Sequence, residues 1–130
     1  MFQFRFAGIP VQVHLSHLLI SGLLAWSFAS GERNPAEWPG AVLANLEQPA
    51  RGQTMALVMA IWVVIISLSV FVHELGHALG ARAWGYSPAI QLMGLGGRTL
   101  PNAPAEIPWH QEVLFTLAGP SAGLLLGVLC

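Results

Sequence analysis

The chain has 130 residues, of which 55% are apolar and 8% are charged, and its mean hydropathy is +0.63. About a quarter of the residues in a soluble domain are charged, so this composition predicts an integral membrane protein and argues against an ordinary soluble domain. The net charge of −1 comes from five Arg and six Glu with no Lys and no Asp, so no nucleic-acid partner is expected. The single cysteine, Cys130, excludes an internal disulfide.

The first fifteen residues alternate apolar and polar side chains on both sides of a break at Gly8-Ile9-Pro10. Phe2, Phe4 and Phe6 alternate before the break, and further apolar residues alternate after it. This pattern predicts a short β-hairpin at the membrane surface. An amphipathic interfacial tail is the alternative.

Residues 14–30 carry no charge and are rich in Leu, which predicts a first membrane span. The alternative is a cleavable signal peptide with Arg5 before its apolar region, but that region is long and the segment preceding it is patterned. His14 and His17 lie on one helical face and could contact a metal, although interfacial polar side chains are the expected role.

Residues 31–53 are polar and contain three Pro, so we expect a connection outside the membrane, with a short interfacial helix after Trp38. The arginines around the spans indicate the orientation, because cytoplasmic loops carry more positive charge. Three arginines lie on one expected side and two on the other: Arg5, Arg82 and Arg98 against Arg33 and Arg51. We therefore expect a cytoplasmic amino terminus in a plasma (inner) membrane.

Residues Met55 to Val72 form an apolar run without charge, Gly or Pro. At about 1.5 Å per residue, these residues span roughly 27 Å as a helix, close to one bilayer core. The run predicts a second membrane span over about residues 54–81. It leads directly into His73-Glu74-Leu75-Gly76-His77, and ionisable groups deep in a span are costly and usually functional.

The spacing of His73 and His77 predicts a zinc site. At about 100° per residue they lie roughly 40° apart around a helix and one turn apart along it, so two imidazole nitrogens can converge on one Zn2+ ion. Glu74 lies at the flank of the pair, where it can take a proton from water during attack on a peptide carbonyl and pass it to the leaving amine. Gly76 and Gly80 fall near the histidine face and permit another helix to approach. A structural histidine pair is the alternative.

After this helix, Arg82 with Trp84 and Tyr86 indicates an exit from the membrane. Residues 89–93 predict a short strand that ends in a glycine-rich turn. A third apolar stretch, from Val113 to Cys130, predicts a span over about residues 111–130. Its glycines recur every four residues and form a smooth stripe, and its proline should kink the helix: Gly119, Gly123, Gly127 and Pro120.

Three stretches together resemble the site-2 protease family of intramembrane zinc metalloproteases. They are Phe71-Val-His-Glu-Leu-Gly-His-Ala-Leu79, Gly94-Leu-Gly-Gly97 and Leu117-Ala-Gly-Pro120, in that order. The segment from Gly8 to Ser16 also looks like the lead-in of family members that have a strand before their first span. The resemblance implies that Gly94, Gly96 and Gly97 belong to a re-entrant loop that binds an extended substrate by β-addition.

The resemblance also implies a third zinc ligand, an Asp on a later span, and this chain contains no Asp. A catalytic zinc normally takes three protein ligands, so we expect the 130 residues to be an incomplete catalytic unit, with an Asp-bearing span downstream. Substitution by Glu106, Glu112 or His110 is the alternative. Gly123 stands where many family members carry Asn.

The expected fold is therefore an all-α polytopic membrane protein with about three transmembrane helices and short β-strand segments near the amino terminus and in a possible re-entrant loop. Residues 1–130 are expected to form one membrane-embedded metalloprotease domain that is incomplete at its carboxyl end. The expected function is a zinc-dependent intramembrane endopeptidase that cleaves transmembrane segments of membrane proteins, with His73 and His77 on Zn2+ and Glu74 as acid and base. The alternatives are a non-catalytic or incomplete membrane metal-binding protein and a soluble-type zincin. The sequence indicates neither the substrate nor the oligomeric state.

Overall fold

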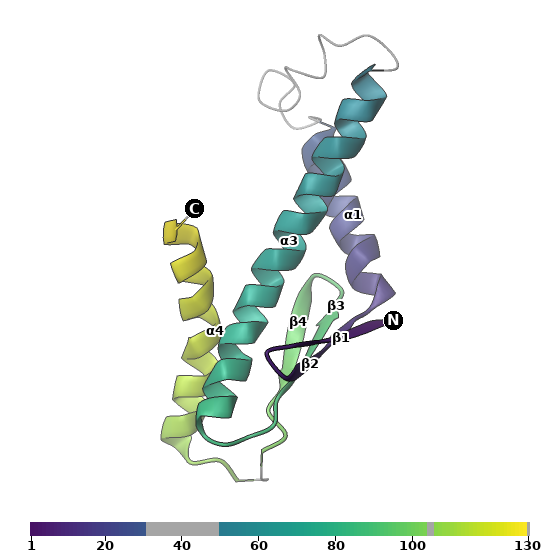
Figure 1. Cartoon of the computed structure of the whole chain (residues 1–130). Helices are drawn as coiled ribbons and strands as arrows, with labels where there is room; N and C mark the ends of the chain where they lie inside the picture. Colours follow the sequence, from purple (N-terminus) through teal and green to yellow (C-terminus); the bar gives the residue numbers. More distant parts are fainter. Residues whose placement is uncertain (31–49, 104–105, 130) are drawn as a thin grey trace. The chain divides into compact units, whose positions relative to one another are not determined.

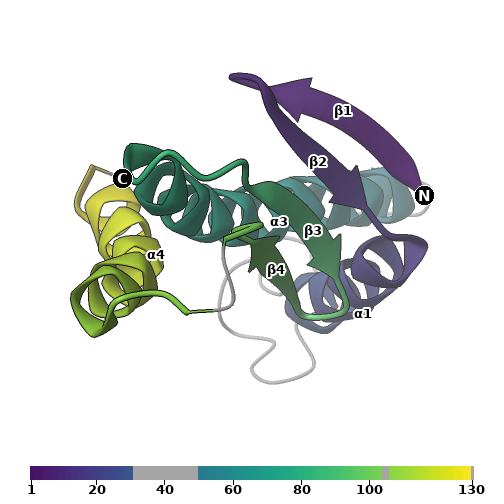
Figure 2. The ribbon, with the colours of Figure 1, turned by 90° about the horizontal axis from the view of Figure 1, so that it is seen from below.

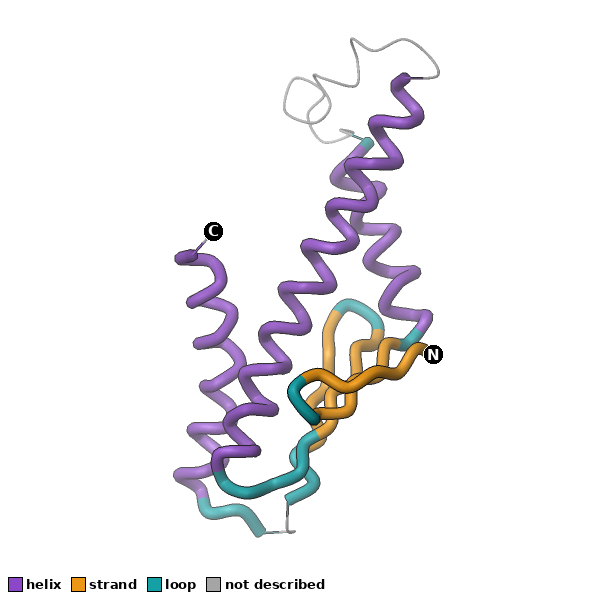
Figure 3. Tube along the Cα trace, in the orientation of Figure 1, coloured by secondary structure: helices purple, strands orange, loops and turns teal. Residues whose placement is uncertain are grey.

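The computed structural model describes residues 1–30, 50–103 and 106–129. This part of the chain is mostly helical and carries a small sheet (Figures 1 and 3). The helices are α1 (Leu15–Ala29), α3 (Ala50–Ala83) and α4 (Trp109–Leu129), and the strands are β1 (Phe2–Phe6), β2 (Ile9–Val13), β3 (Ala89–Met93) and β4 (Gly96–Leu100). The chain divides into two compact units, one of Met1–His17 with Leu68–Cys130 and one of Leu18–Ser67.

The sheet belongs to the first unit, and its strands lie side by side in the order β1, β2, β3, β4 (Figure 2). β1 and β2 are antiparallel, as are β3 and β4, whereas β2 and β3 pair in parallel with Val11 opposite Ile90. The predicted amino-terminal hairpin and the strand at residues 89–93 are confirmed. The prediction missed β4 and the parallel pairing that joins the two hairpins into one sheet.

Both hairpins turn over two residues. In the first turn Ala7 and Gly8 both have positive φ, as in a type I′ turn, which matches the twist of the strands. In the second turn Gly94 has a positive φ of 57° and Leu95 does not, as in a type II′ turn. The predicted glycine-rich turn is therefore Gly94-Leu95, and Gly96 and Gly97 begin β4.

One face of the sheet packs on the carboxyl-terminal part of α3. Alternate residues of β2 and β3 point to this face because side chains alternate along a strand. The resulting core contains Ile9, Val11, Ala78, Ile90 and Leu92, with Val13, Val70, Phe71 and Leu75 packed against it. Since the core includes α3 residues on both sides of Glu74, it fixes the sheet against the helical turns that carry the two histidines.

α3 ends in a Schellman motif. Tyr86 N donates to Ala81 O at 3.2 Å, Gly85 N donates to Arg82 O at 2.9 Å, and Gly85 has a φ of +81°. This pattern of bonds satisfies the last helical carbonyls and needs a left-handed residue, which glycine supplies at no steric cost. The helix therefore stops within two turns of His77 and the chain returns as β3.

α4 lies beside the carboxyl-terminal half of α3 (Figures 1 and 3). Gly76 makes this close approach possible, because a β-carbon on it would lie 2.8 Å from Ala122 Cβ. Gly80 is nearly as tight, at 3.2 Å from Ala118 Cβ. The expectation that these two glycines admit another helix is confirmed, and that helix is α4.

The second unit contains most of α1 and the amino-terminal half of α3. Phe28 stacks on Trp62 with a ring-centroid distance of 4.7 Å. Ser21, Ala25 and Ala29 are fully or almost fully buried and recur every four residues, so they form one face of α1. The predicted interfacial helix after Trp38 lies outside the described residues. The predicted polar connection ends earlier than expected, because α3 already begins at Ala50.

α3 and α4 are both long and apolar enough to cross a membrane. α3 covers the predicted span over about residues 54–81, and α4 covers the predicted span over about residues 111–130 as far as Leu129, the last residue described. The predicted span over residues 14–30 is the 15-residue α1. At about 1.5 Å per residue it rises roughly 22 Å, less than the bilayer core of about 30 Å.

Candidate functional site

The imidazoles of His73 and His77 converge on one side of α3. Their Nε2 atoms lie 3.3 Å apart, and their ring planes are nearly perpendicular, at 79°. Two nitrogens bound at about 2.0–2.1 Å to one tetrahedral zinc lie roughly 3.3–3.4 Å apart, so this spacing fits one edge of such a site. The donor chemistry also fits, because neutral imidazole is a common zinc ligand.

The other ring nitrogen of His77 is held by α4. His77 Nδ1 lies 2.7 Å from Phe115 O, and a carbonyl oxygen only accepts hydrogen bonds, so Nδ1 carries the proton and donates. In a neutral imidazole the lone pair is then on Nε2, the atom that faces His73. A hydrogen bond from the second nitrogen to a carbonyl is the usual support of a metal-binding histidine.

Gly119 of α4 provides the space around this ring. It is buried, and a β-carbon placed on it would overlap His77 Nε2. One turn further along α4, Gly123 is less tight, since a β-carbon there would lie 3.9 Å from His73 Nδ1. Two of the three glycines in the predicted stripe of α4 therefore face the histidines, and Gly119 is the one in tight contact; a β-carbon on Gly127 would meet nothing within 4 Å.

Glu74 is buried, with 6% of its surface exposed, beside the histidine pair. Its carboxylate is bound by Thr99 of β4, whose Oγ1 lies 2.7 Å from Glu74 Oε2. The same hydroxyl also lies 3.0 Å from the backbone oxygen of Glu74. Gly97 of β4 borders the carboxylate as well, because a β-carbon on it would lie 2.8 Å from Glu74 Cδ.

A cleft of about 390 Å3 opens between this turn of α3 and the beginning of β4. Its lining brings together His73 and Glu74 from the helix with Gly96 and Gly97 from the strand. Ser69 and Val70 complete it one turn earlier on α3. A residue expected to bind metal, the expected acid/base residue and two of the three expected substrate-binding glycines thus border one cleft.

Gly94 lies in the turn between β3 and β4 and is bound to the start of α1. Gly94 N donates to Ser16 Oγ at 3.3 Å, and Gly94 O accepts from His17 Nδ1 at 3.1 Å. His14 N also donates to Leu92 O at 2.9 Å. The fully buried imidazole of His17 thus helps to hold the β3–β4 turn, which differs from the expected interfacial role of this side chain.

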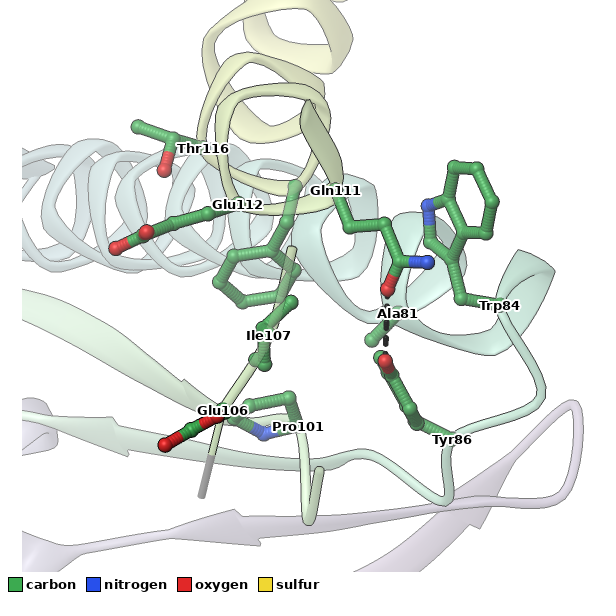
Figure 4. Close-up of a pocket in the computed structure, with 10 residues that line it drawn as sticks. Ala81, Trp84, Tyr86, Pro101, Glu106, Ile107, Gln111, Glu112 and Thr116 are labelled. Atoms are coloured by element: carbon green, nitrogen blue, oxygen red, sulfur yellow. Dashed lines mark hydrogen bonds between the residues drawn. The ribbon is translucent and has the colours of Figure 1, made fainter. Parts of the chain in front are cut away.

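Glu106 and Glu112 line a different pocket, of about 420 Å3, with Trp84 and Tyr86 (Figure 4). Tyr86 Oη donates to Gln111 Oε1 at 2.7 Å in this pocket. His110 lies at the same end of α4, with its ring centroid 6.0 Å from that of Trp84. Neither histidine of the α3 pair lines this pocket. Within the described ranges, no group of three or more His, Cys, Asp or Glu side chains is arranged to hold a metal.

Three contributors to this arrangement were missed by the sequence analysis: Thr99, the carbonyl of Phe115 and the contact of Gly97 with Glu74. Each depends on the packing of a distant segment on α3, and a backbone carbonyl leaves no signal in a sequence. The glycine stripe on α4 was the one available hint, because it indicated a helix that approaches another closely.

The chain is similar to two curated proteins. A Synechocystis protein named "putative zinc metalloprotease" is 33% identical over 120 residues, which are 92% of this chain and 28% of that protein. A Methanocaldococcus jannaschii protein named "zinc metalloprotease" is 25% identical over 126 residues, which are 96% of this chain and 30% of that protein. Both relatives are named as zinc metalloproteases. The chain spans less than a third of the length of either. No family model matches the chain, and no solved structure matches it significantly.

Proposed function

We propose that this chain carries the metal-binding and acid/base residues of a zinc-dependent intramembrane endopeptidase of the site-2 protease type. The observation that carries the proposal is the convergence of His73 and His77 at 3.3 Å beside the buried carboxylate of Glu74. The names of the two similar proteins support the metalloprotease part of the proposal.

In this proposal His73 and His77 hold Zn2+ through their Nε2 atoms. The bond from His77 Nδ1 to Phe115 O fixes the tautomer and the direction of that ring. When bound, zinc supplies a Lewis acid that activates water and polarises a peptide carbonyl.

Glu74 is the proposed general base and general acid. Its carboxylate borders the same cleft as His73, so it can accept a proton from a water molecule there. The proton then passes to the nitrogen of the leaving amine as the peptide bond breaks. Burial limits competing hydrogen bonds from bulk water, which keeps the carboxylate available for this transfer.

The third protein ligand of the zinc is proposed to lie outside the described residues. A catalytic zinc takes three protein ligands and a water, and α3 provides two of the three. Glu106 and Glu112 border the pocket with Trp84 and Tyr86 and do not border the cleft of Glu74.

The substrate is proposed to be an extended segment of another membrane protein that pairs with the outer edge of β4. β4 pairs with β3 on one side, and its first residues, Gly96 and Gly97, border the cleft. A strand added at that edge would pass the carboxylate of Glu74 with main-chain hydrogen bonds and little dependence on side chains. Gly94 contributes the turn that places this edge.

The proposed setting is a lipid bilayer, in an inner membrane with a cytoplasmic amino terminus. Large apolar side chains are exposed all along α3 and α4, including Leu57, Val64, Leu68, Leu124 and Val128, each at least half exposed. A soluble core helix would bury such residues, whereas lipid tails cover them at no cost.

The test measures zinc content and proteolysis of a membrane-protein substrate by the full natural protein in liposomes. We expect one zinc per chain in the wild type and in Glu74→Gln, and a loss of zinc in the His73→Ala, His77→Ala double variant. Peptide-bond cleavage should occur in the wild type and be absent from both variants. Unchanged zinc content in the double variant would show that His73 and His77 only pack against each other and do not bind the metal. Cleavage by Glu74→Gln would refute the role of Glu74. Zinc binding without cleavage by the wild type would favour a non-catalytic membrane metal-binding protein.

A further inference from the structure

The hydroxyl of Thr99 in β4 contacts both the side chain and the backbone of Glu74. Its Oγ1 lies 2.7 Å from the carboxylate Oε2 and 3.0 Å from the backbone oxygen of the same glutamate. The shorter contact has the length expected for a hydroxyl that donates to a charged oxygen, which is a strong class of hydrogen bond.

Gly97 and Thr99 both border the Glu74 side chain, and they do so from the same face of β4. Residues two apart in a strand point to the same side of the sheet, so both positions face α3. At position 97 the absence of a side chain leaves the space that the Glu74 side chain fills, with Cδ 2.8 Å from where a β-carbon would be. At position 99 the hydroxyl reaches the carboxylate. Together they border a slot on the β4 side that holds the Glu74 side chain.

A glutamate with a catalytic role needs such a slot. Its side chain has three torsions and loses much conformational entropy when fixed, so it stays ordered only where contacts hold it. A buried carboxylate also needs hydrogen-bond donors to replace the water it has lost. Thr99 meets both needs, because it fixes the position of Oε2 and supplies a donor.

We propose that Thr99 is a positioning residue that holds the Glu74 carboxylate at the cleft for proton transfer. This inference rests on the proposed function of Glu74. Thr99 touches neither the substrate nor the histidines in this role, and it acts through Glu74 alone. Its hydroxyl is the group required, and its methyl group is not.

The test compares Thr99→Val, which keeps the shape and removes the hydroxyl, with Thr99→Ser, which keeps the hydroxyl. Thr116→Val makes the same chemical change at an exposed site on α4 and serves as the matched control. Each variant of the full natural protein is assayed for kcat, KM, zinc content and the rate at which dicyclohexylcarbodiimide labels Glu74, measured by mass spectrometry. The exposed carboxylates Glu106 and Glu112 are internal references for labelling.

We expect Thr99→Val to lower kcat by roughly ten- to a hundredfold, the effect of one lost hydrogen bond to a charged group, with KM and zinc content unchanged. Glu74 should be labelled faster in this variant, because its carboxylate is no longer held. Thr99→Ser and Thr116→Val should behave as the wild type. If Thr99→Val does not accumulate, Thr99→Ala takes its place with the same expectations.

Where the wild type is active, either of two results would overturn the inference: wild-type kcat in Thr99→Val, or equal loss of activity in Thr99→Val and Thr99→Ser, which would indicate a packing role. A wild-type protein that cleaves no substrate would refute the proposed function. The labelling rates would then test only whether the Thr99 hydroxyl holds the Glu74 carboxylate. Faster labelling of Glu74 in Thr99→Val than in Thr99→Ser would support the contact. Equal labelling would overturn it.

Discussion

Gly119 of α4 lies directly against the imidazole of His77, with no room for a β-carbon between the helix backbone and Nε2. The same ring is held from its other nitrogen by the carbonyl of Phe115, one turn earlier on α4. α4 therefore sets both the position and the tautomer of a histidine that belongs to α3. The geometry of the proposed metal site depends on the contact between these two helices as much as on the histidines.

The first prediction is that Gly119→Ala displaces the His77 ring and weakens zinc binding. The added methyl would overlap Nε2, the proposed ligand atom, and the loss of an orienting contact typically costs roughly ten- to a hundredfold in metal affinity. Gly127→Ala is the control on the same helix, since a β-carbon there meets nothing within 4 Å. Zinc affinity measured by competition with a chromophoric chelator tests this, and equal affinity in both variants would contradict it.

The second prediction separates the roles of two neighbouring glycines. Gly97→Ala should push the Glu74 carboxylate from its place and lower kcat by roughly 10²–10⁴-fold, the usual contribution of a general acid/base, while zinc content stays at the wild-type level. Gly96→Ala should be tolerated structurally, because a β-carbon there meets nothing within 4 Å. Zinc loss in Gly97→Ala would show that this glycine also supports the position of the histidines on α3 and does not act on Glu74 alone.

The helix that carries the histidines could be predicted from the sequence, whereas the strand that borders Glu74 could not. The apolar run from Met55 and the spacing of His73 and His77 are local signals, and they predicted α3 and its histidine face. β4 gave no such signal, because a segment that begins Gly96-Gly97 has low strand propensity and resembles a turn. It forms a strand because β3 pairs with it across a two-residue turn.

The parallel pairing of β2 and β3 was also beyond a local interpretation. Val11 and Ile90 are far apart in the sequence, and a parallel pair leaves no turn between its strands to indicate the partner. The pairing is stabilised by the core that β2 and β3 share on α3. The alternating pattern of each strand shows which of its side chains are buried, but it does not show that both strands pack on the same helix. The contact between Thr99 and Glu74 follows from that placement, so it could not be predicted earlier.

The third prediction concerns the missing zinc ligand. Glu106→Gln, Glu112→Gln and His110→Ala should leave zinc content and affinity unchanged, singly and together, because these side chains lie at the pocket of Trp84 and Tyr86. Zinc per chain measured by elemental analysis in the triple variant tests this. A fall to the level of the His73→Ala, His77→Ala variant would identify one of the three as a ligand.

The last prediction tests whether α3 faces lipid. Val64 lies in the middle of the apolar part of α3 and is 63% exposed. If lipid covers this face, Val64→Arg places a charge near the bilayer centre and should cost about 2.5–3.5 kcal/mol of insertion free energy. In a soluble helix the same exposed substitution would change stability by no more than about 0.5 kcal/mol. Gln53→Arg, at the polar beginning of α3, is the matched control and should insert as the wild type does. Glycosylation mapping in microsomes measures the inserted fraction of each variant, and equal insertion of Val64→Arg and Gln53→Arg would contradict a membrane-spanning α3.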